Sequence, residues 1–280
     1  MTSVVGRIAS IKQPRNGYVK PSTMKAVVFD DGIILHEKEN IHSSLVGEAV
    51  DYLTRFIMGT DKEEVFRISL QGAKLAEEAF GFKHAVRIAH KLLKKIKKLN
   101  RRSVLFACKL VSFDVWYRNP MAAITAPNYK VIKPDKQTIE NIITLVNRNI
   151  TFFKKYGPIT SDGFTFAPVT PNIEEYKKMM ETGKGSYGGY TSLVSTGDGD
   201  FLTADTLWDL KVSKSKPQSR HTLQILMYWI MGQHSGQEKF KNITKIGIYN
   251  PRLNMAFQLD VSEVPEEVIK AVEIEVIGYK

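Results

Sequence analysis

Apolar residues recur at helical spacing through much of the first half of the chain. After Ser43 or Ser44, either of which can cap a helix, apolar positions return every three or four residues from Val46 to Ile57. This pattern predicts a helix that ends before Gly59. Similar patterns predict further helices over about 61–80, 83–99, 102–117 and 136–156. We therefore expect the first half to be mainly helical.

Strand patterns begin with a predicted hairpin over residues 25–36. Ala26–Phe29 and Ile33–His36 flank Asp31-Gly32, a favoured turn pair. Later in the chain, consecutive strands are predicted over 190–196, 199–203 and 207–212, and they indicate a meander.

The last hundred residues combine these strands with helices. Residues 219–232 are too apolar and too long for a strand and predict a mostly buried helix. Residues 243–249 and 253–259 predict strands, the second by strict alternation of apolar and polar positions. Short helices are expected near 173–180 and 265–272.

These elements predict an α/β fold with a central mixed sheet flanked by helices and a helical N-terminal half. The chain shows no internal repeat, low-complexity tract or Gly/Ser-rich linker. Residues 1–280 are therefore interpreted as a single domain, mainly helical over about 24–157 and sheet-rich over about 158–280.

Composition narrows the class of protein. With 280 residues and 43% hydrophobic content, the chain can bury a sizeable core. Cys108 is its only cysteine, which excludes an internal disulfide and an iron–sulfur cluster held by four cysteines. The early residues lack the apolar segment of a secretory signal, and the most apolar stretch, 223–231, is far shorter than the roughly 20 residues that cross a bilayer. We expect a cytoplasmic protein without membrane contact.

Positive charge favours a polyanionic partner. Forty Lys and Arg face 29 Asp and Glu, for a formal charge of +11, so nucleic acid is the first candidate. A dense basic run with interleaved apolar residues extends over 83–102. It fits a phosphate-binding groove, a membrane surface or an ordinary solvated helix face.

Candidate chemistry gathers on two predicted strands. Asp209 and Lys211 are two positions apart, so their side chains share one face of a strand. Asp200, on the preceding strand, can lie across from Asp209, and two carboxylates can hold a hard divalent cation such as Mg²⁺. Lys211 would then orient or help deprotonate a water and offset charge on a phosphate. The plainer alternative is a solvated ion pair.

The predicted helix at 219–232 carries two polar residues in an apolar run. Gln224 and Tyr228 are four positions apart and therefore share one helix face. A buried, unsatisfied glutamine costs roughly 1–3 kcal/mol. These residues therefore either satisfy a structural partner or face a polar site.

The order of these motifs resembles the RecB-like branch of the PD-(D/E)XK nucleases. It consists of G-D-x-D-F at 197–201, L-x-D-x-K at 207–211, Q-x-x-x-Y at 224–228 and an apolar strand ending I-G-I-Y, followed by Arg252. The resemblance covers about residues 190–260 and implies a restriction-endonuclease-like core, DNA as substrate and Mg²⁺ or Mn²⁺ as cofactor. By it, Asp200 and Asp209 are metal ligands, with Asp198 as a backup, Lys211 is the catalytic lysine, and Gln224 and Tyr228 position the nucleic acid and the site.

An early helix in that family carries a glycine followed four residues later by a metal-binding histidine. Here Gly47 is followed by Asp51, which can also ligate Mg²⁺ or Mn²⁺ through oxygen, and Glu48 is a competing candidate. An i,i+4 pair between Asp51 and Arg55 is the structural alternative.

Flanking basic residues complete the predicted site: Lys214, Lys216, Arg220 and Arg252 are expected to contact phosphates. The resemblance implies an exonuclease or related enzyme in phage or bacterial replication, recombination, repair or defence, acting as a homo-oligomer or with a partner protein of those processes. The alternatives are a non-catalytic nucleic-acid-binding or assembly protein with the same fold, or a module whose basic helix binds an acidic protein.

Overall fold

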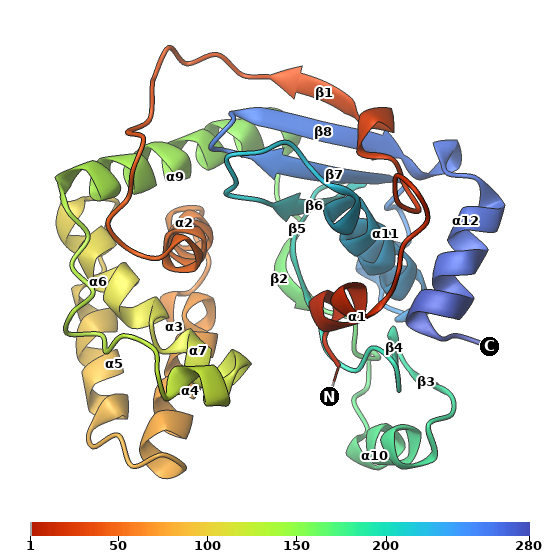
Figure 1. Ribbon diagram of the computed structural model, residues 1–280, viewed down its shortest axis with the longest axis horizontal. Coiled ribbons are helices and arrows are strands. Elements are labelled where there is room, and N and C mark those ends of the chain that lie inside the picture. The colour runs from red at the N-terminus through yellow and green to blue at the C-terminus, as the bar shows by residue number, and fades with distance from the viewer. Residues whose placement is uncertain (1) are drawn as a thin grey trace. The chain divides into compact units, whose positions relative to one another are not determined.

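The computed structural model describes residues 2–280 as a mixed α/β protein with a helical N-terminal half and a six-stranded mixed sheet in the C-terminal half (Figure 1). The chain divides into two compact units. Unit 1 contains Met1–Phe29 and Lys155–Lys280, and unit 2 contains Asp30–Lys154. None of the helices within residues 2–280 is both long and apolar enough to cross a membrane.

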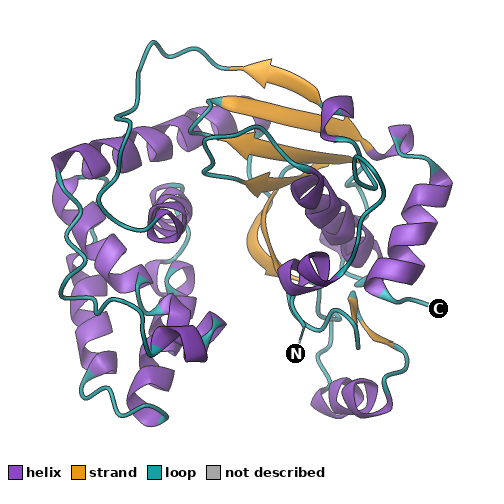
Figure 2. Cartoon of the chain, viewed as in Figure 1, coloured by secondary structure: helices purple, strands orange, loops and turns teal. Residues whose placement is uncertain are grey.

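Among the described residues, helices are the only regular elements of unit 2, and Figure 2 shows them joined by loops without a strand. The predicted helix after Ser43 is confirmed, but His42 caps it by accepting a hydrogen bond at Nδ1 from the Ser44 amide. The last two residues of its final helix fall in unit 1. The helices are α2 (Ser43–Ile57), α3 (Lys62–Val65), α4 (Arg67–Glu78), α5 (Ala85–Lys95), α6 (Arg101–Val111), α7 (Asp114–Arg118), α8 (Pro120–Ala123) and α9 (Lys136–Tyr156).

Two of the long predicted helices are broken. The one expected over 61–80 divides at Phe66 into α3 and α4, and the one expected over 102–117 divides between Val111 and Asp114. The second break lets α7 pack closely on α4: a Cβ on Gly72 would lie 2.0 Å from the carbonyl oxygen of Phe113. Tertiary packing therefore sets these helix ends.

The predicted hairpin over 25–36 is wrong. Its first arm forms β1 (Lys25–Val28), but residues 33–36 form no strand, and β1 pairs with β8 (Met255–Asp260). Side chains of α9 bind the second arm instead. Arg148 donates to both carboxylate oxygens of Asp31, at 2.7 and 2.8 Å, and to the Ile33 carbonyl, while Asn141 bonds the amide and carbonyl of His36. These side chains therefore satisfy backbone groups of Ile33 and His36 that would pair with the first strand in a hairpin.

The sheet of unit 1 has the order β1-β8-β7-β6-β5-β2, with one parallel pair, β6 with β7. The predicted meander is wrong at its first strand. Of residues 190–196, only 190–191 form a strand, and they belong to a separate two-stranded sheet. The place beside β5 is taken by β2, which was not predicted. The remaining predicted strands are confirmed. The strands not yet bounded are β2 (Ser161–Thr165), β3 (Ser186–Tyr187), β4 (Tyr190–Thr191), β5 (Asp198–Leu202), β6 (Thr206–Leu210) and β7 (Lys245–Asn250).

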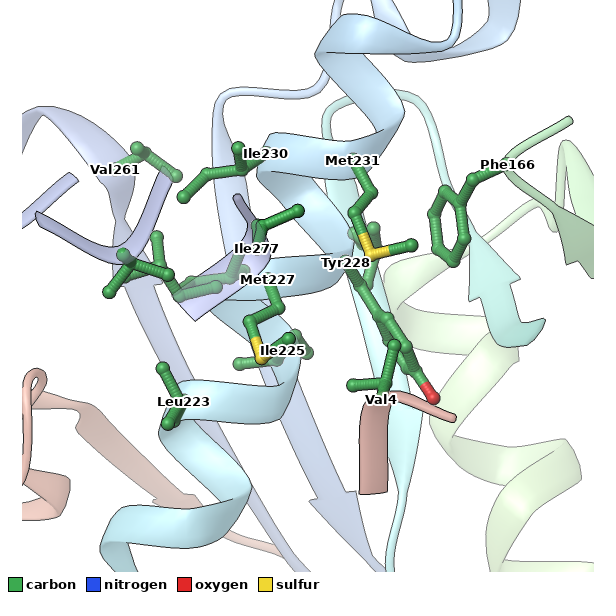
Figure 3. Packing of buried hydrophobic residues seen from close by; sticks show 14 of the residues in the cluster. Val4, Phe166, Leu223, Ile225, Met227, Tyr228, Ile230, Met231, Val261 and Ile277 are labelled. Carbon is green, nitrogen blue, oxygen red and sulfur yellow. The ribbon is translucent and has the colours of Figure 1, made fainter. Parts of the chain in front are cut away.

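One helix, α11 (Ser219–His234), runs along one face of this sheet (Figure 1). Its apolar side chains join those of the sheet in a continuous core that includes Leu207, Ile246 and Ile248. Burial of each such side chain contributes about 1.5–3 kcal/mol. Figure 3 shows Tyr228 in this core, with Val4 beside its ring. The other α-helices of unit 1 are α1 (Val4–Ser10), α10 (Ile173–Thr182) and α12 (Glu266–Ala271), which continues as a π-helical turn over Val272–Ile277.

Candidate functional site

Asp209 and Lys211 lie together at the end of β6, as their spacing predicts. The Lys211 amide donates to the Tyr249 carbonyl at 3.0 Å, so the backbone stays in register with β7 beyond the last residue of β6. The ammonium group of Lys211 lies 3.0 Å from Oδ1 and 2.8 Å from Oδ2 of Asp209. The Asp209 side chain is 2% exposed and that of Lys211 is 25% exposed, so this is a largely buried ion pair and the solvated alternative is wrong.

Asp200 approaches the same strand from β5. The register pairs Phe201 with Trp208 and Leu202 with Leu207, and its continuation sets Asp200 opposite Asp209. Oδ2 of Asp200 accepts a hydrogen bond of 2.7 Å from the Leu210 amide. The carboxylate thus takes the place of a strand carbonyl at this end of β6. Asp198, the predicted backup, is exposed at the start of β5.

The charges of this group are mutually dependent. Burial lowers the pKa of Lys211, but the attraction of Asp209 and Asp200 outweighs it and the pKa is raised. Burial also raises the pKa of Asp209, against the opposing effect of Lys211. Lys211 is therefore a cation at neutral pH, which suits it to stabilise negative charge and not to act as a base.

Gln224 and Tyr228 on α11 bond each other. Nε2 of Gln224 donates to the Tyr228 hydroxyl at 2.9 Å, and the two residues are 8% and 5% exposed. Burial raises the pKa of Tyr228 well above its ordinary value, with a further contribution from Asp209. The helix α11 packs against β6, so the structure places the element that carries the predicted Q-x-x-x-Y pair on the D-x-K strand.

His221 joins the site without having been predicted. It lies one turn before Gln224, and its Nδ1 accepts a hydrogen bond of 3.1 Å from the Gln218 amide in a capping box that starts α11. Burial, then the charges of Lys211 and Arg220, lower its pKa to about 4. His221 is thus neutral at pH 7. Its i,i+3 spacing from Gln224 is the sequence signal that would have found it.

The predicted phosphate-binding residues lie on three segments, the loop after β6, the start of α11 and the turn after β7, and one unpredicted asparagine joins the loop to the turn. Nδ2 of Asn250 donates to the carbonyls of Ser213 and Ser215, and Oδ1 accepts from the Arg252 amide at 3.0 Å. Asn250 therefore connects the loop that carries Lys214 and Lys216 with the turn that carries Arg252. Lys214, Lys216 and Arg220 are exposed, and Arg252 is half-buried.

Asp51 and Glu48 lie on α2 in unit 2, whereas Asp200 and Asp209 belong to unit 1. Burial and the nearby carboxylate of Asp114 raise the pKa of Glu48 to about 8. Asp114 is itself buried and accepts hydrogen bonds from Tyr52 and Ser69. The assignment of Asp51 or Glu48 to a shared metal site stays a prediction.

The carboxylates of unit 1 fit a magnesium ion that keeps part of its water shell. Within residues 2–280, no three or more His, Cys, Asp or Glu side chains are grouped so that they could hold a metal. Mg²⁺, however, is often bound by one or two carboxylates together with water and substrate phosphate. Oδ2 of Asp209 is buried and receives no well-directed hydrogen bond, although Lys211 is its ion-pair partner. Asp200 and Asp209 together therefore offer a suitable donor set.

The candidate site thus takes residues from three elements of unit 1: Asp200 on β5, Asp209 and Lys211 at the end of β6, and His221, Gln224 and Tyr228 on α11, which packs against β6. The site combines two carboxylates, one buried cation and a hydrogen-bonded amide–phenol pair. Comparisons with protein-family models, curated proteins and solved structures found no match to this chain.

Proposed function

We propose that the chain is a divalent-metal-dependent nuclease that hydrolyses DNA phosphodiester bonds, on a core of the PD-(D/E)XK type. The observation that carries the proposal is the convergence of Asp200, Asp209 and Lys211 at one end of β6, with Lys211 held as a cation. A phosphodiester is anionic and hydrolyses very slowly without catalysis. A site for its cleavage needs positive charge placed against fixed carboxylates.

Each side chain has a distinct task in this proposal. Asp200 and Asp209 would hold Mg²⁺, which when bound supplies Lewis-acid polarisation of the phosphoryl group. The ammonium group of Lys211 stabilises the charge that develops on the phosphate oxygens and donates a hydrogen bond that orients the attacking water. Its raised pKa favours these roles over proton abstraction.

The surrounding groups position the substrate. Lys214, Lys216 and Arg220 are exposed next to the site and can contact successive phosphates, which would give binding a marked salt dependence. The Gln224–Tyr228 pair keeps the wall of the site rigid, because each side chain satisfies the other within the core. This bond uses the amide nitrogen of Gln224, so its amide oxygen keeps its capacity to accept a hydrogen bond.

Cleavage assays on linear and circular DNA, single- and double-stranded, with Mg²⁺ or Mn²⁺ test the proposal. We expect Asp209→Asn and Lys211→Met to abolish metal-dependent cleavage. Asp205→Asn is the matched control. Asp205 lies on the turn before β6, its side chain is about half exposed, and it forms an ion pair with Lys245. Loss of cleavage in the control as well, or cleavage that persists in both site variants, would refute the assignment.

The second candidate is a non-catalytic nucleic-acid-binding protein with the same fold. It is favoured by the lack, within residues 2–280, of any grouping of three metal-ligating side chains. DNA binding without cleavage in any divalent metal would establish this alternative. Cleavage by the intact chain would exclude it.

A further inference from the structure

Two adjoining cavities lie within unit 2. The first, of about 240 Å³, is lined by aromatic and small apolar residues together with Ser112 and Asn128. The second, of about 320 Å³, shares Phe82, Asn128 and Tyr129 with the first. The shared residues form a common wall, and the two adjoining cavities are together called the recess.

The first cavity has aromatic walls in fixed mutual orientation. Phe113 and Tyr129 are stacked, with ring centroids 5.9 Å apart and planes at 25°. Phe82 meets Phe113 edge-on at 6.0 Å, and Trp116 forms a further part of the lining. Phe113 is buried, whereas Phe82, Trp116 and Tyr129 are half-buried and line the cavity. These three rings offer aromatic surface to a planar, apolar-faced group.

The second cavity adds positive charge. Lys83, His84 and Lys130 line it, and the linings of both cavities, which lie wholly within the described residues, contain no Asp or Glu. Between Glu78 and Asp135 the chain has thirteen Lys and Arg and a single acidic residue, the buried Asp114. The recess therefore belongs to a strongly basic segment.

Positive charge is not balanced by acidic side chains among the described residues that line the recess. Like charges so arranged repel each other until an anion binds among them. A polyanion that also carries flat rings matches both properties of the recess.

We propose that this recess binds single-stranded nucleic acid, with one base stacked in the aromatic cavity and the adjoining phosphates held by Lys83 and Lys130. In a duplex the faces of the bases are already stacked on each other, whereas a single strand offers them to aromatic side chains. Ser112 and Asn128 can bond the edge of the bound base. The inference rests on the proposed function, because it specifies single strands as the form of nucleic acid that the proposed nuclease binds. The binding itself needs neither a metal nor the residues of unit 1.

Binding in EDTA separates this inference from catalysis. Fluorescence anisotropy would compare a labelled thymidine oligomer, its ribose counterpart and the duplex of the same length. We expect the single strands to bind more tightly than the duplex, and Tyr129→Ala to weaken single-strand binding about tenfold, the order expected for one lost stacking contact. Tyr117→Ala is the control, because Tyr117 is exposed in the same unit and lines neither cavity.

Tryptophan fluorescence provides a readout that does not depend on the folding of Tyr129→Ala. Trp116 lines the cavity, whereas Trp208 is fully buried and Trp229 donates to the Ile243 carbonyl, both in unit 1. The thymidine oligomer should quench the intact protein, and Trp116→Phe should still bind the oligomer but lose the quenching.

Equal affinity for single strand and duplex, with no quenching of Trp116, would overturn the inference. Single-strand binding by a protein that cleaves DNA in no metal would support it while refuting the proposed nuclease. Metal-dependent cleavage together with equal binding of single strand and duplex would support the proposed nuclease and refute single-strand binding in the recess.

Discussion

The ammonium group of Lys211 lies 2.8 Å from Oδ2 of Asp209, in an ion pair whose carboxylate is almost completely buried. Replacing Lys211 by Met would leave that carboxylate without its counter-charge. Breaking one side of a buried pair costs about 3–5 kcal/mol. We expect the free energy of unfolding at pH 7, measured by urea titration, to decrease by an amount near the lower end of this range, because Lys211 is partly exposed.

The double variant Asp209→Asn/Lys211→Met is the control for this loss. It removes the stranded charge, so it should recover a large part of the stability that the single variant loses. Lowering the pH should also reduce the difference in free energy of unfolding between Lys211→Met and the intact chain, because the raised pKa of Asp209 favours its neutral form. Equal stability of the single variant and the intact chain at pH 7 would contradict the buried-pair interpretation.

The hydrogen bond between Gln224 and Tyr228 gives a second prediction. Tyr228→Phe keeps the ring against Phe166, 5.3 Å away between centroids, but removes the acceptor of the Gln224 amide. We expect a loss of about 1–3 kcal/mol, since the buried donor is left unsatisfied. In a double-mutant cycle with Gln224→Met, the two losses should be clearly less than additive; additivity within about 0.5 kcal/mol would show that the pair is not coupled.

The raised pKa of Glu48 should make the free energy of unfolding of the metal-free protein depend on pH. Its folded-state pKa of about 8 lies above the ordinary value of 4.5, so the folded state binds more protons between these pH values. The stabilising contribution of the neutral carboxyl is present below about pH 4.5 and is lost as the pH rises through 8. Glu48→Gln should therefore gain stability relative to the intact chain as the pH is raised.

Thermal unfolding in EDTA at pH 5 and pH 8 measures this gain. Glu78→Gln is the matched control, because Glu78 is an exposed glutamate of the same unit, four residues after Lys74. A difference between Glu48→Gln and the intact chain that stays constant over this pH range would rule out a raised pKa.

Two glycines predict opposite effects of the same substitution. A Cβ on Gly189 would lie 2.1 Å from the carbonyl oxygen of Met231, so Gly189→Ala forces backbone apart and should cost about 3 kcal/mol or more. Gly47 lies inside α2 with nothing within 4 Å of an added Cβ, so Gly47→Ala should stabilise by about 0.5–1 kcal/mol. Urea unfolding of both variants measures the contrast, which a destabilised Gly47→Ala would contradict.

Elements with strong periodicity were predictable from the sequence. The helices α2 and α9 follow from apolar spacing and β8 from strict alternation, whereas α11 and β7 follow from apolar runs of suitable length. By contrast, β2 has the polar, glycine-containing sequence Ser161–Thr165, which carries no strand signal and becomes a strand by pairing with β5. The Asp31-Gly32 turn failed as a hairpin for a related reason: side chains of α9, over a hundred residues away, bind the second arm.

The candidate site was predictable where it depends on local geometry. Alternation along a strand is enough to bring Asp209 and Lys211 together, and helical spacing is enough for Gln224 and Tyr228. Asn250 was missed because its contacts join segments whose proximity depends on the folded sheet, whereas the spacing of His221 from Gln224 would have drawn attention to it. The role of Asn250 follows from tertiary structure, which no short motif records.

The division of the chain has a consequence for its synthesis. Unit 2 is one uninterrupted stretch, so the ribosome completes it while most of unit 1 is still unmade. The strand β1 must wait longest, because Lys25 pairs with Gln258, about 230 positions later; at about 5–20 residues per second this delay lasts on the order of 10–50 seconds. Its side chains are mostly exposed even in the finished sheet, so little apolar surface is left uncovered while the nascent chain waits for its partner.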